Sequence, residues 1–458
     1  MKQRGFFKYL ASLVFLTGCC GVTKEVAEKP TVPWHPVDES SYSPVVKDGE
    51  TVAKCVKGDL ASLIDVALKN NPQTRKSWYL AKAAAAQKGK AESAFYPKIT
   101  GSGTVQKQQV QATGSSSVKT TFAPTLDLTY KLYQFGADQE AAESAREALN
   151  AANYQYNRSL QTVVYNVAKS YSDLHTAEST IEAREASVKD AQTAYEAISR
   201  RTQAGLGSMQ DLLQAKANLL AAEYELAAAH SSVETKRATL ANVMGIRVSR
   251  ELKIKPPTVP EKPEALSTEV ERLIQRALQE RPDLLANYAI LKSKEHTEIS
   301  SKKFLLPELD VGLSGSLLKT YNASTGRNYK GFLAVQWNIF DGFNNTYTVV
   351  QNRAQRKAAM QDLRATELSI VSDIWSNYHA FQASIPQLTA ARSLEKASQE
   401  AFEAVQAGYK SGLKSLLDLL TAQSSLAEAR LQKITAESNF TTSLAALVYV
   451  TGGLVSSR

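Results

Sequence analysis

The chain has 458 residues and a formal net charge of +9, with 22% charged and 43% hydrophobic residues. Three positive charges belong to Lys2, Arg4 and Lys8, so the chain after residue 18 carries 9 − 3 = +6, without a dense Lys/Arg block. This distribution argues against a nucleic-acid site and predicts a solvated surface. After residue 18 the sequence has no run of 18 or more apolar residues, so it predicts no transmembrane helix there. A membrane protein of this sequence would be anchored or would cross as a closed β-barrel.

The first 18 residues have the composition of a signal peptide. Their basic start is followed by a short apolar run, Ala11–Leu16, which is too short to span a bilayer as a helix. The run ends in Leu16-Thr17-Gly18-Cys19, which resembles the lipobox of bacterial lipoproteins, whose cysteine carries diacylglycerol and palmitate. We therefore expect a signal peptide at 1–18, lipidation of Cys19 and a Pro-bearing tether at 19–58. An ordinary signal peptide with a chance cysteine is the alternative.

The sequence contains an internal repeat. With an offset of 210 residues, Leu63-Ile64 recurs as Leu273-Ile274 and Pro72 recurs as Pro282. With an offset of 207, further pairs match, namely Tyr171 and Tyr378, Gly205-Leu206 and Gly412-Leu413, Asp211 and Asp418, and Gly245 and Gly452. Offsets that hold over such a length indicate a duplication. The predicted organisation is a first repeat at 59–246, a Pro-rich linker at 247–265, a second repeat at 266–453 and a tail at 454–458.

Each repeat is predicted to begin with two short helices and two strands. The first repeat has a helix at about 59–71 and another of about 20 residues that ends before Pro97. The alternating apolar segments are Ile99–Val110, Phe122–Leu132, Leu309–Leu317 and Leu333–Ile339. A period of two over about ten residues is typical of transmembrane β-strands, although soluble β-hairpins are the alternative. The turns between the strands, at 114–117 and 322–326, would lie on the outer side.

Long helices follow the strands. The segment Ala137–Gln203 contains no proline and predicts a helix about 100 Å long, with a return helix at Met209–Val243. The second repeat predicts a helix at Asn345–Ala407, a turn at Gly408–Gly412 and a return to about Val450. Their weak apolar seams favour side-by-side packing into a bundle or a helical wall.

If the four strands cross a membrane, several copies of the chain must combine their strands into one closed barrel. Four strands cannot close a barrel, and unpaired backbone groups in lipid cost several kcal/mol each. Two copies would supply eight strands and three would supply twelve, and composition does not decide between them.

The repeat, the strand pairs and four short motifs resemble the TolC family of outer-membrane factors, in its lipoprotein branch. The motifs are Leu132–Gly136 and Ile339–Gly342 at the strand-to-helix junctions, and Gly205–Leu213 and Gly412–Leu420 at the helix turns. The resemblance implies a mainly α protein with a transmembrane β part, a homotrimer whose 12-stranded β-barrel continues as a 12-helix α-barrel. It also implies an outer-membrane exit duct for a periplasmic adaptor (membrane fusion protein) and an inner-membrane pump, in contact with outer-membrane lipid.

The resemblance assigns roles at the tips of the helix pairs. The predicted adaptor contacts are Gly205, Leu206, Gly412 and Leu413. The predicted periplasmic gate consists of Asp211, Tyr409, Lys414 and Asp418. Tyr409 and Lys414 would bond across to Asp211, and Asp418 would line the closed aperture.

Two departures from the family pattern weaken the predicted gate. Thr421 stands where members with two rings of carboxylates have a second acid, so a single or weaker cation-binding ring is expected. Lys414 stands at a position where an arginine would bind a carboxylate through two hydrogen bonds, whereas the lysine ammonium group acts as a point charge. Asp211 and Asp418 are predicted about a turn and a half into their helices, and solvated carboxylates near a helix N-terminus are the alternative interpretation.

No catalytic site, metal site or cofactor is expected beyond the lipid at Cys19. The histidines stand singly, without metal-ligand spacing, at His35, His175, His230, His296 and His379. The residue after the lipidated cysteine is Cys20 rather than an aspartate, which favours the outer membrane over the inner one. Cys20 and Cys55 either form a disulfide or leave Cys55 as a free thiol. The competing functions are an exit duct for type I protein secretion and a lipid-anchored periplasmic coiled-coil scaffold or adaptor.

Overall fold

The computed structural model describes residues 58–112, 115–248, 254–256, 269–321 and 325–453. The predicted signal peptide, Cys19, Cys20, Cys55 and the tail at 454–458 lie outside these ranges, as does most of the predicted tether and linker. Within these ranges, no helix is long and apolar enough to cross a membrane. They also contain no group of three His, Cys, Asp or Glu side chains placed to hold a metal ion.

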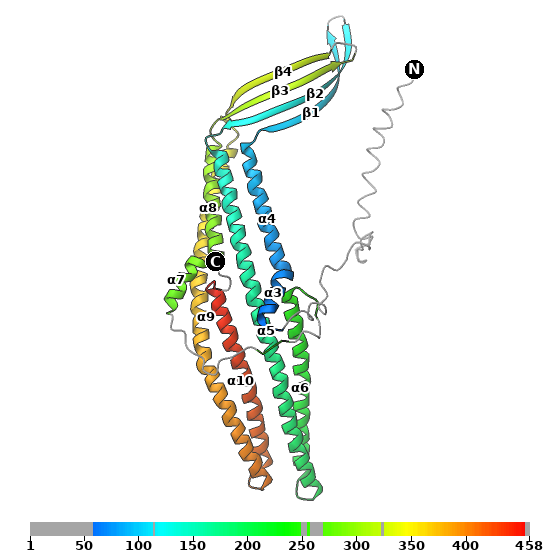
Figure 1. Ribbon diagram of the computed structural model, residues 1–458, viewed down its shortest axis with the longest axis vertical. Helices are drawn as coiled ribbons and strands as arrows, with labels where there is room; N and C mark the ends of the chain where they lie inside the picture. The colour runs from blue at the N-terminus through cyan, green and yellow to red at the C-terminus, as the bar shows by residue number, and fades with distance from the viewer. Residues whose placement is uncertain (1–57, 113–114, 249–253, 257–268, 322–324, 454–458) are drawn as a thin grey trace, which may run out of the picture. The chain divides into compact units, whose positions relative to one another are not determined.

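The same order of elements occurs twice along the chain (Figure 1). The first half contains α3 (Leu60–Asn70), α4 (Pro72–Glu92), the 3₁₀ turn η3 (Ser93–Phe95), β1 (Lys98–Ala112), β2 (Ser115–Tyr133), α5 (Ala137–Gln203) and α6 (Met209–Met244). The second half contains α7 (Val270–Glu280), α8 (Pro282–Lys303), β3 (Glu308–Thr320), β4 (Thr325–Gln336), α9 (Asn344–Lys410) and α10 (Leu416–Val450). Both long helices, α5 and α9, have 67 residues, and the predicted bounds of α5 are confirmed.

Four predicted boundaries are wrong. β4 ends at Gln336 rather than Ile339, because its partner strand β3 begins only at Glu308, which pairs with Gln336. The indole N–H of the next residue, Trp337, donates to the carbonyl of Leu305 at 3.1 Å. The predicted outer turns are too long, since β2 already begins at Ser115 and β4 at Thr325. The turn expected from Gly408 begins later, because α9 continues to Lys410.

The four strands form one antiparallel sheet in the order β1-β2-β3-β4, so the hairpins of the two halves meet at β2 and β3. The register places Ile99, Leu128, Leu313 and Gly331 in one row across the sheet. Because side chains alternate along a strand, this register sorts them by polarity. One face carries Ile99, Val105, Phe122, Leu126, Leu128, Leu313, Leu317, Leu333 and Val335, and the other carries Thr100, Ser102, Thr104, Thr125, Asp127, Ser314, Ser316, Asn328 and Lys330.

Each half has its own buried core beside the long helices. Leu63, Leu174 and Leu240 bring together α3, α5 and α6 in the first half. Ile370 and Leu447 bring together α9 and α10, on which α7 also packs. Burial of a side chain of this size contributes about 1.5–3 kcal/mol, and such packing stabilises long helices more than their propensity does. Helix α5 also contacts α8 and α10 and so links the halves.

Equivalent contacts hold the C-terminal ends of the return helices α6 and α10 in the two halves. The side-chain amide of Asn71 donates to the carbonyl of Val243 at 2.6 Å. At the matching position in the second half, Arg281 donates to the carbonyl of Val450 at 3.2 Å. Arg281 is buried and also forms an ion pair with Asp283 at 2.6 Å. The end of each return helix is therefore held to the break between the two short helices of its half.

Candidate functional site

The tips of the two long helix pairs have the same backbone geometry. Gly205 and Gly412 have φ values of +75° and +80°, in the left-handed region that favours glycine. The amide N–H of Leu206 donates back to a carbonyl in the last turn of α5 at 2.9 Å, and that of Leu413 does the same to α9 at 2.9 Å. This pattern is the Schellman closure of a helix C-terminus, and it reverses the chain within five residues.

Each return helix begins with a serine cap followed by an aspartate. The backbone N–H of Asp211 donates to the hydroxyl of Ser208 at 3.1 Å, and that of Asp418 donates to Ser415 at 3.1 Å. Both aspartates are the third residue of their helix, in the first turn. The prediction that they lie a turn and a half inside is therefore wrong, because the serine caps start the helices directly before Met209 and Leu416.

Three of the four predicted gate residues line one cavity between the tips. Asp211 of α6, Tyr409 of α9 and Lys414 of the second turn border a space of about 370 Å³. Among the described residues, the Asp211 carboxylate makes no hydrogen bond or ion pair with either of the other two side chains. The structure thus brings the three groups around one space without a bond between them.

Arg201 at the end of α5 also lines this cavity, and the sequence analysis missed it. Its guanidinium lies over the ring of Tyr409, 5.3 Å from the ring centre, as in a cation–π contact. Nearby, the stem of Lys414 lies against Gly408, where an added Cβ would be 2.8 Å from the Lys414 Cγ. Arg201 and Tyr409 therefore make a contact between the first tip and the second, in addition to the packing of Ala194 of α5 against Phe402 and Leu419.

Asp418 is turned toward its own helix cap. Its carboxylate accepts hydrogen bonds from the backbone N–H of Ser415 at 3.0 Å and from the Ser415 hydroxyl at 2.8 Å. These hydrogen bonds, the backbone one first, lower the pKa of the Asp418 carboxyl below its ordinary value, and Lys414 adds to the effect. The carboxylate is exposed and charged, but part of its capacity to bind a cation is already used.

The predicted adaptor contacts are open to solvent. Leu206 is 73% exposed and Leu413 is 82% exposed, and Leu417 at the start of α10 is 74% exposed. Exposed leucines at the end of a helix pair are a feature of surfaces that a partner covers.

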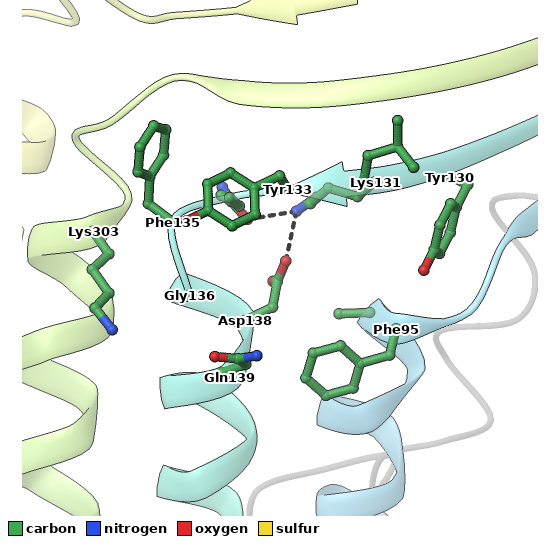
Figure 2. A pocket seen from close by; sticks show the side chains of 12 residues that line it. Phe95, Tyr130, Lys131, Tyr133, Phe135, Gly136, Asp138, Gln139 and Lys303 are labelled. Atoms are coloured by element: carbon green, nitrogen blue, oxygen red, sulfur yellow. Dashed lines mark hydrogen bonds and ion pairs between the residues drawn. The ribbon is translucent and has the colours of Figure 1, made fainter. Parts of the chain in front are cut away.

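A second cavity lies at the junction between β2 and α5 (Figure 2). Phe135 and Gly136 both have a positive φ, of 50° and 79°, which turns the chain sharply from strand into helix. Lys131 bridges this turn, because its Nζ lies 2.8 Å from the side-chain oxygen of Gln134 and 3.5 Å from a carboxylate oxygen of Asp138. Figure 2 shows Lys131 pointing toward Asp138. The motif recognised in the sequence at 132–136 is thus a strained and internally bonded corner.

Known proteins are similar to this chain in sequence. The outer membrane efflux protein family model matches residues 63–246 and 273–453. Protein CyaE of Bordetella pertussis is 26% identical over 411 residues, which cover 86% of this chain and 85% of that protein. Outer membrane efflux protein BepC of Brucella suis is 24% identical over 378 residues, or 80% of this chain and 79% of that protein.

Solved structures of similar fold are outer membrane channels. The Campylobacter jejuni CmeC channel superposes with a TM-score of 0.79 at 19% identity, covering 92% of this chain and 90% of that one. The open state of the Neisseria gonorrhoeae MtrE channel superposes with a TM-score of 0.73 at 21% identity, covering 86% of this chain and 89% of that one.

Proposed function

Because the chain belongs to the outer membrane efflux protein family, we propose that three copies of it assemble into a single duct. The chain is an outer-membrane exit duct for efflux, and its family consists of channel proteins rather than enzymes. The observation that supports assembly is the sheet, which ends in the edge strands β1 and β4 and has one apolar face. Edges in lipid are costly, so they pair with the edges of neighbouring copies, and three copies supply twelve strands.

The long helices continue this barrel as a twelve-helix tunnel in the periplasm. Each chain contributes the pairs α5–α6 and α9–α10, together with the shorter α4 and α8 on which they pack. Substrate passes through passively, delivered by an inner-membrane pump through a periplasmic adaptor. Cys19 carries the lipid that attaches the tether to the outer membrane.

The helix tips are the gate of the duct and the contact with the adaptor. In the closed tip of the assembled duct, Tyr409 and Lys414 bond across to Asp211 and hold the second helix pair against the first; in the single chain the three residues border one cavity without such a bond. Asp418 of each copy forms a single ring of carboxylates, weakened by its bonds to Ser415. The exposed Gly205-Leu206 and Gly412-Leu413 turns receive the adaptor, and adaptor binding favours the open packing.

Conductance in planar bilayers tests the gate. Tyr409→Phe removes a hydroxyl but keeps the ring over Arg201, and Asp211→Ala removes the carboxylate. Loss of one bond of about 1 kcal/mol in the closed tip raises the open-to-closed ratio about fivefold, so both variants should conduct more. Tyr224→Phe, at a side chain of α6 that is 73% exposed, is the control and should conduct like the wild type.

The same preparation tests the assembly. The mass of the detergent-solubilised complex should equal three chains. A monomeric mass together with an absence of conductance would contradict the duct, whereas a conducting trimer with unchanged conductance in both variants would contradict only the assignment of the gate.

A further inference from the structure

The apolar face of the sheet carries three cations and, within the described strands, no carboxylate. Lys107 of β1, Lys319 of β3 and Arg327 of β4 share this face with the leucines, since each stands in register with a residue of the apolar rows. All three are exposed. The carboxylates of the strands stand on the opposite face, at Asp127, Glu308 and Asp310.

Two of the cations, Lys319 and Arg327, are neighbours on this face, and Lys107 lies two strands away from Lys319, at a distance of roughly 12 Å judged from the strand spacing. Lys319 pairs with Thr325, so Arg327 is its diagonal neighbour, with Cβ atoms about 7–8 Å apart. Lys319 also pairs with Phe122, which pairs with Val105, and Lys107 is the next residue on that face of β1. Among the described residues, none of the three side chains has a hydrogen-bond or ion-pair partner. The like charges of Lys319 and Arg327 repel each other unless an anion stands between them.

Their height on the strand matches the edge of a bilayer. From Leu309 to Lys319, β3 advances ten residues, or about 34 Å at about 3.4 Å per residue. A strand tilted by about 40° in a barrel would rise about 26 Å over this length, close to the lipid-facing band of about 25 Å in outer-membrane barrels. The segment from Leu309 to Leu317 therefore fills the apolar band, and the cations stand at its outer edge, where Lys and Arg reach the headgroups.

An apolar groove lies on the same face below the cations. Leu126, Leu128, Leu313 and Tyr329 border a space of about 440 Å³, which is within the range of small-molecule sites, roughly 300–1,000 Å³. It exists because Gly315 and Gly331, which stand in the same rows, have no side chains to fill it. A groove of this lining accepts an acyl chain rather than a polar group.

We propose that Lys107, Lys319 and Arg327, together with the groove below them, form a binding site for a phosphorylated, acylated lipid of the outer leaflet. The lipid phosphates lie among the three cations and an acyl chain lies in the groove. The site rests on the proposed duct, because it needs this face of the sheet to meet lipid. Lipid bound at this site stabilises the contact between the outer rim of the barrel and the outer leaflet.

The test is the binding of lipid A, a phosphorylated and multiply acylated glucosamine disaccharide. Purified trimer in phosphatidylcholine nanodiscs is titrated with lipid A, and bound lipid is counted by native mass spectrometry. Each cation near a lipid surface raises the affinity about fivefold. A variant that combines Lys107→Gln, Lys319→Gln and Arg327→Gln should therefore bind lipid A on the order of 100-fold more weakly. The matched control compares Lys107→Gln with Lys119→Gln, because Lys119 is an exposed cation on the polar face and lies beside Thr120, the strand partner of Lys107.

The outcomes separate this site from the duct itself. Wild-type binding by the triple variant would overturn the site and leave the duct untouched if its conductance is normal. A loss of binding in Lys119→Gln equal to that in Lys107→Gln would show that the polar face meets lipid, which overturns both the site and the proposed barrel. Equal binding of a dephosphorylated lipid A would overturn the role of the phosphates. Loss in the triple variant alone, restricted to the phosphorylated lipid, is the expected result.

Discussion

At the residue scale, Gly312 decides where the ring of Phe332 lies on the polar face of the sheet. Gly312 of β3 pairs with Phe332 of β4, and the ring covers the glycine, which is buried. A Cβ at position 312 would lie 2.3 Å from Cζ of Phe332 and 2.4 Å from its Cε1, closer than real contacts allow. The Nζ of Lys330 lies 5.5 Å from the centre of the same ring. In the proposed duct, this ring faces the lumen of the barrel.

Gly312→Ala should therefore be destabilising. The added methyl group displaces the Phe332 ring, and overpacking of this kind costs about 1–3 kcal/mol. Thermal unfolding of the trimer in detergent measures the loss as a lower Tm. Gly315→Ala is the matched control, because its Cβ would lie 3.6 Å from the Tyr329 ring, an ordinary contact. Combining Gly312→Ala with Phe332→Ala should remove the clash, and equal Tm values for the two single glycine variants would contradict the argument.

At the element scale, one buried carboxylate joins α8 to α9. The Glu298 side chain is 7% exposed and accepts from Lys302 of its own helix at 2.7 Å and from Arg356 of α9 at 2.8 Å, with Arg353 at 3.4 Å. Hydrogen bonds from Lys302 and Arg356 lower the pKa of the Glu298 carboxyl to about 2. A carboxylate taken out of water is tolerated only with such partners, so the pairing of the two helices depends on its charge.

The contribution of Glu298 to stability should depend on pH in one direction. Because its pKa is lowered in the folded state, its contribution is complete above the ordinary value of 4.5 and disappears as the pH falls toward about 2. The Tm difference between wild type and Glu298→Gln should therefore be constant from about pH 7 to 5 and shrink between about pH 4.5 and 2. Glu92→Gln removes the partner of Lys88 in a more exposed pair within one helix and should change Tm little at any pH. A Tm difference for Glu298→Gln that is independent of pH would refute the assignment.

At the scale of the whole molecule, most elements were predictable from the sequence, but the contacts between the halves were not. The absence of proline from 137 to 203 and the glycine after it define α5, and the serine caps define where α6 and α10 begin. The contact of Arg201 with Tyr409 joins residues 208 positions apart (409 − 201), and no local pattern identifies it. The pairing of β2 with β3 likewise depends on how the halves pack. The candidate gate was found by resemblance, and its roles remain predictions.

The attachment of the whole molecule to the membrane distinguishes a duct from a lipid-anchored scaffold. Cys19 lies outside the described residues, so its lipid has to be tested by substitution. Cys19→Ser removes the acceptor thiol, and a scaffold held only by the lipid would then enter the aqueous fraction of a cell lysate. In the proposed duct, a barrel closed by twelve strands keeps its apolar face in the bilayer, so the variant should still require detergent for extraction. Radiolabelled palmitate should be incorporated by the wild type and not by the variant. A Cys19→Ser chain that is released by buffer alone would contradict the proposed barrel, in which leucines of the apolar face such as Leu313 and Leu333, 59% and 66% exposed in one chain, are covered by lipid.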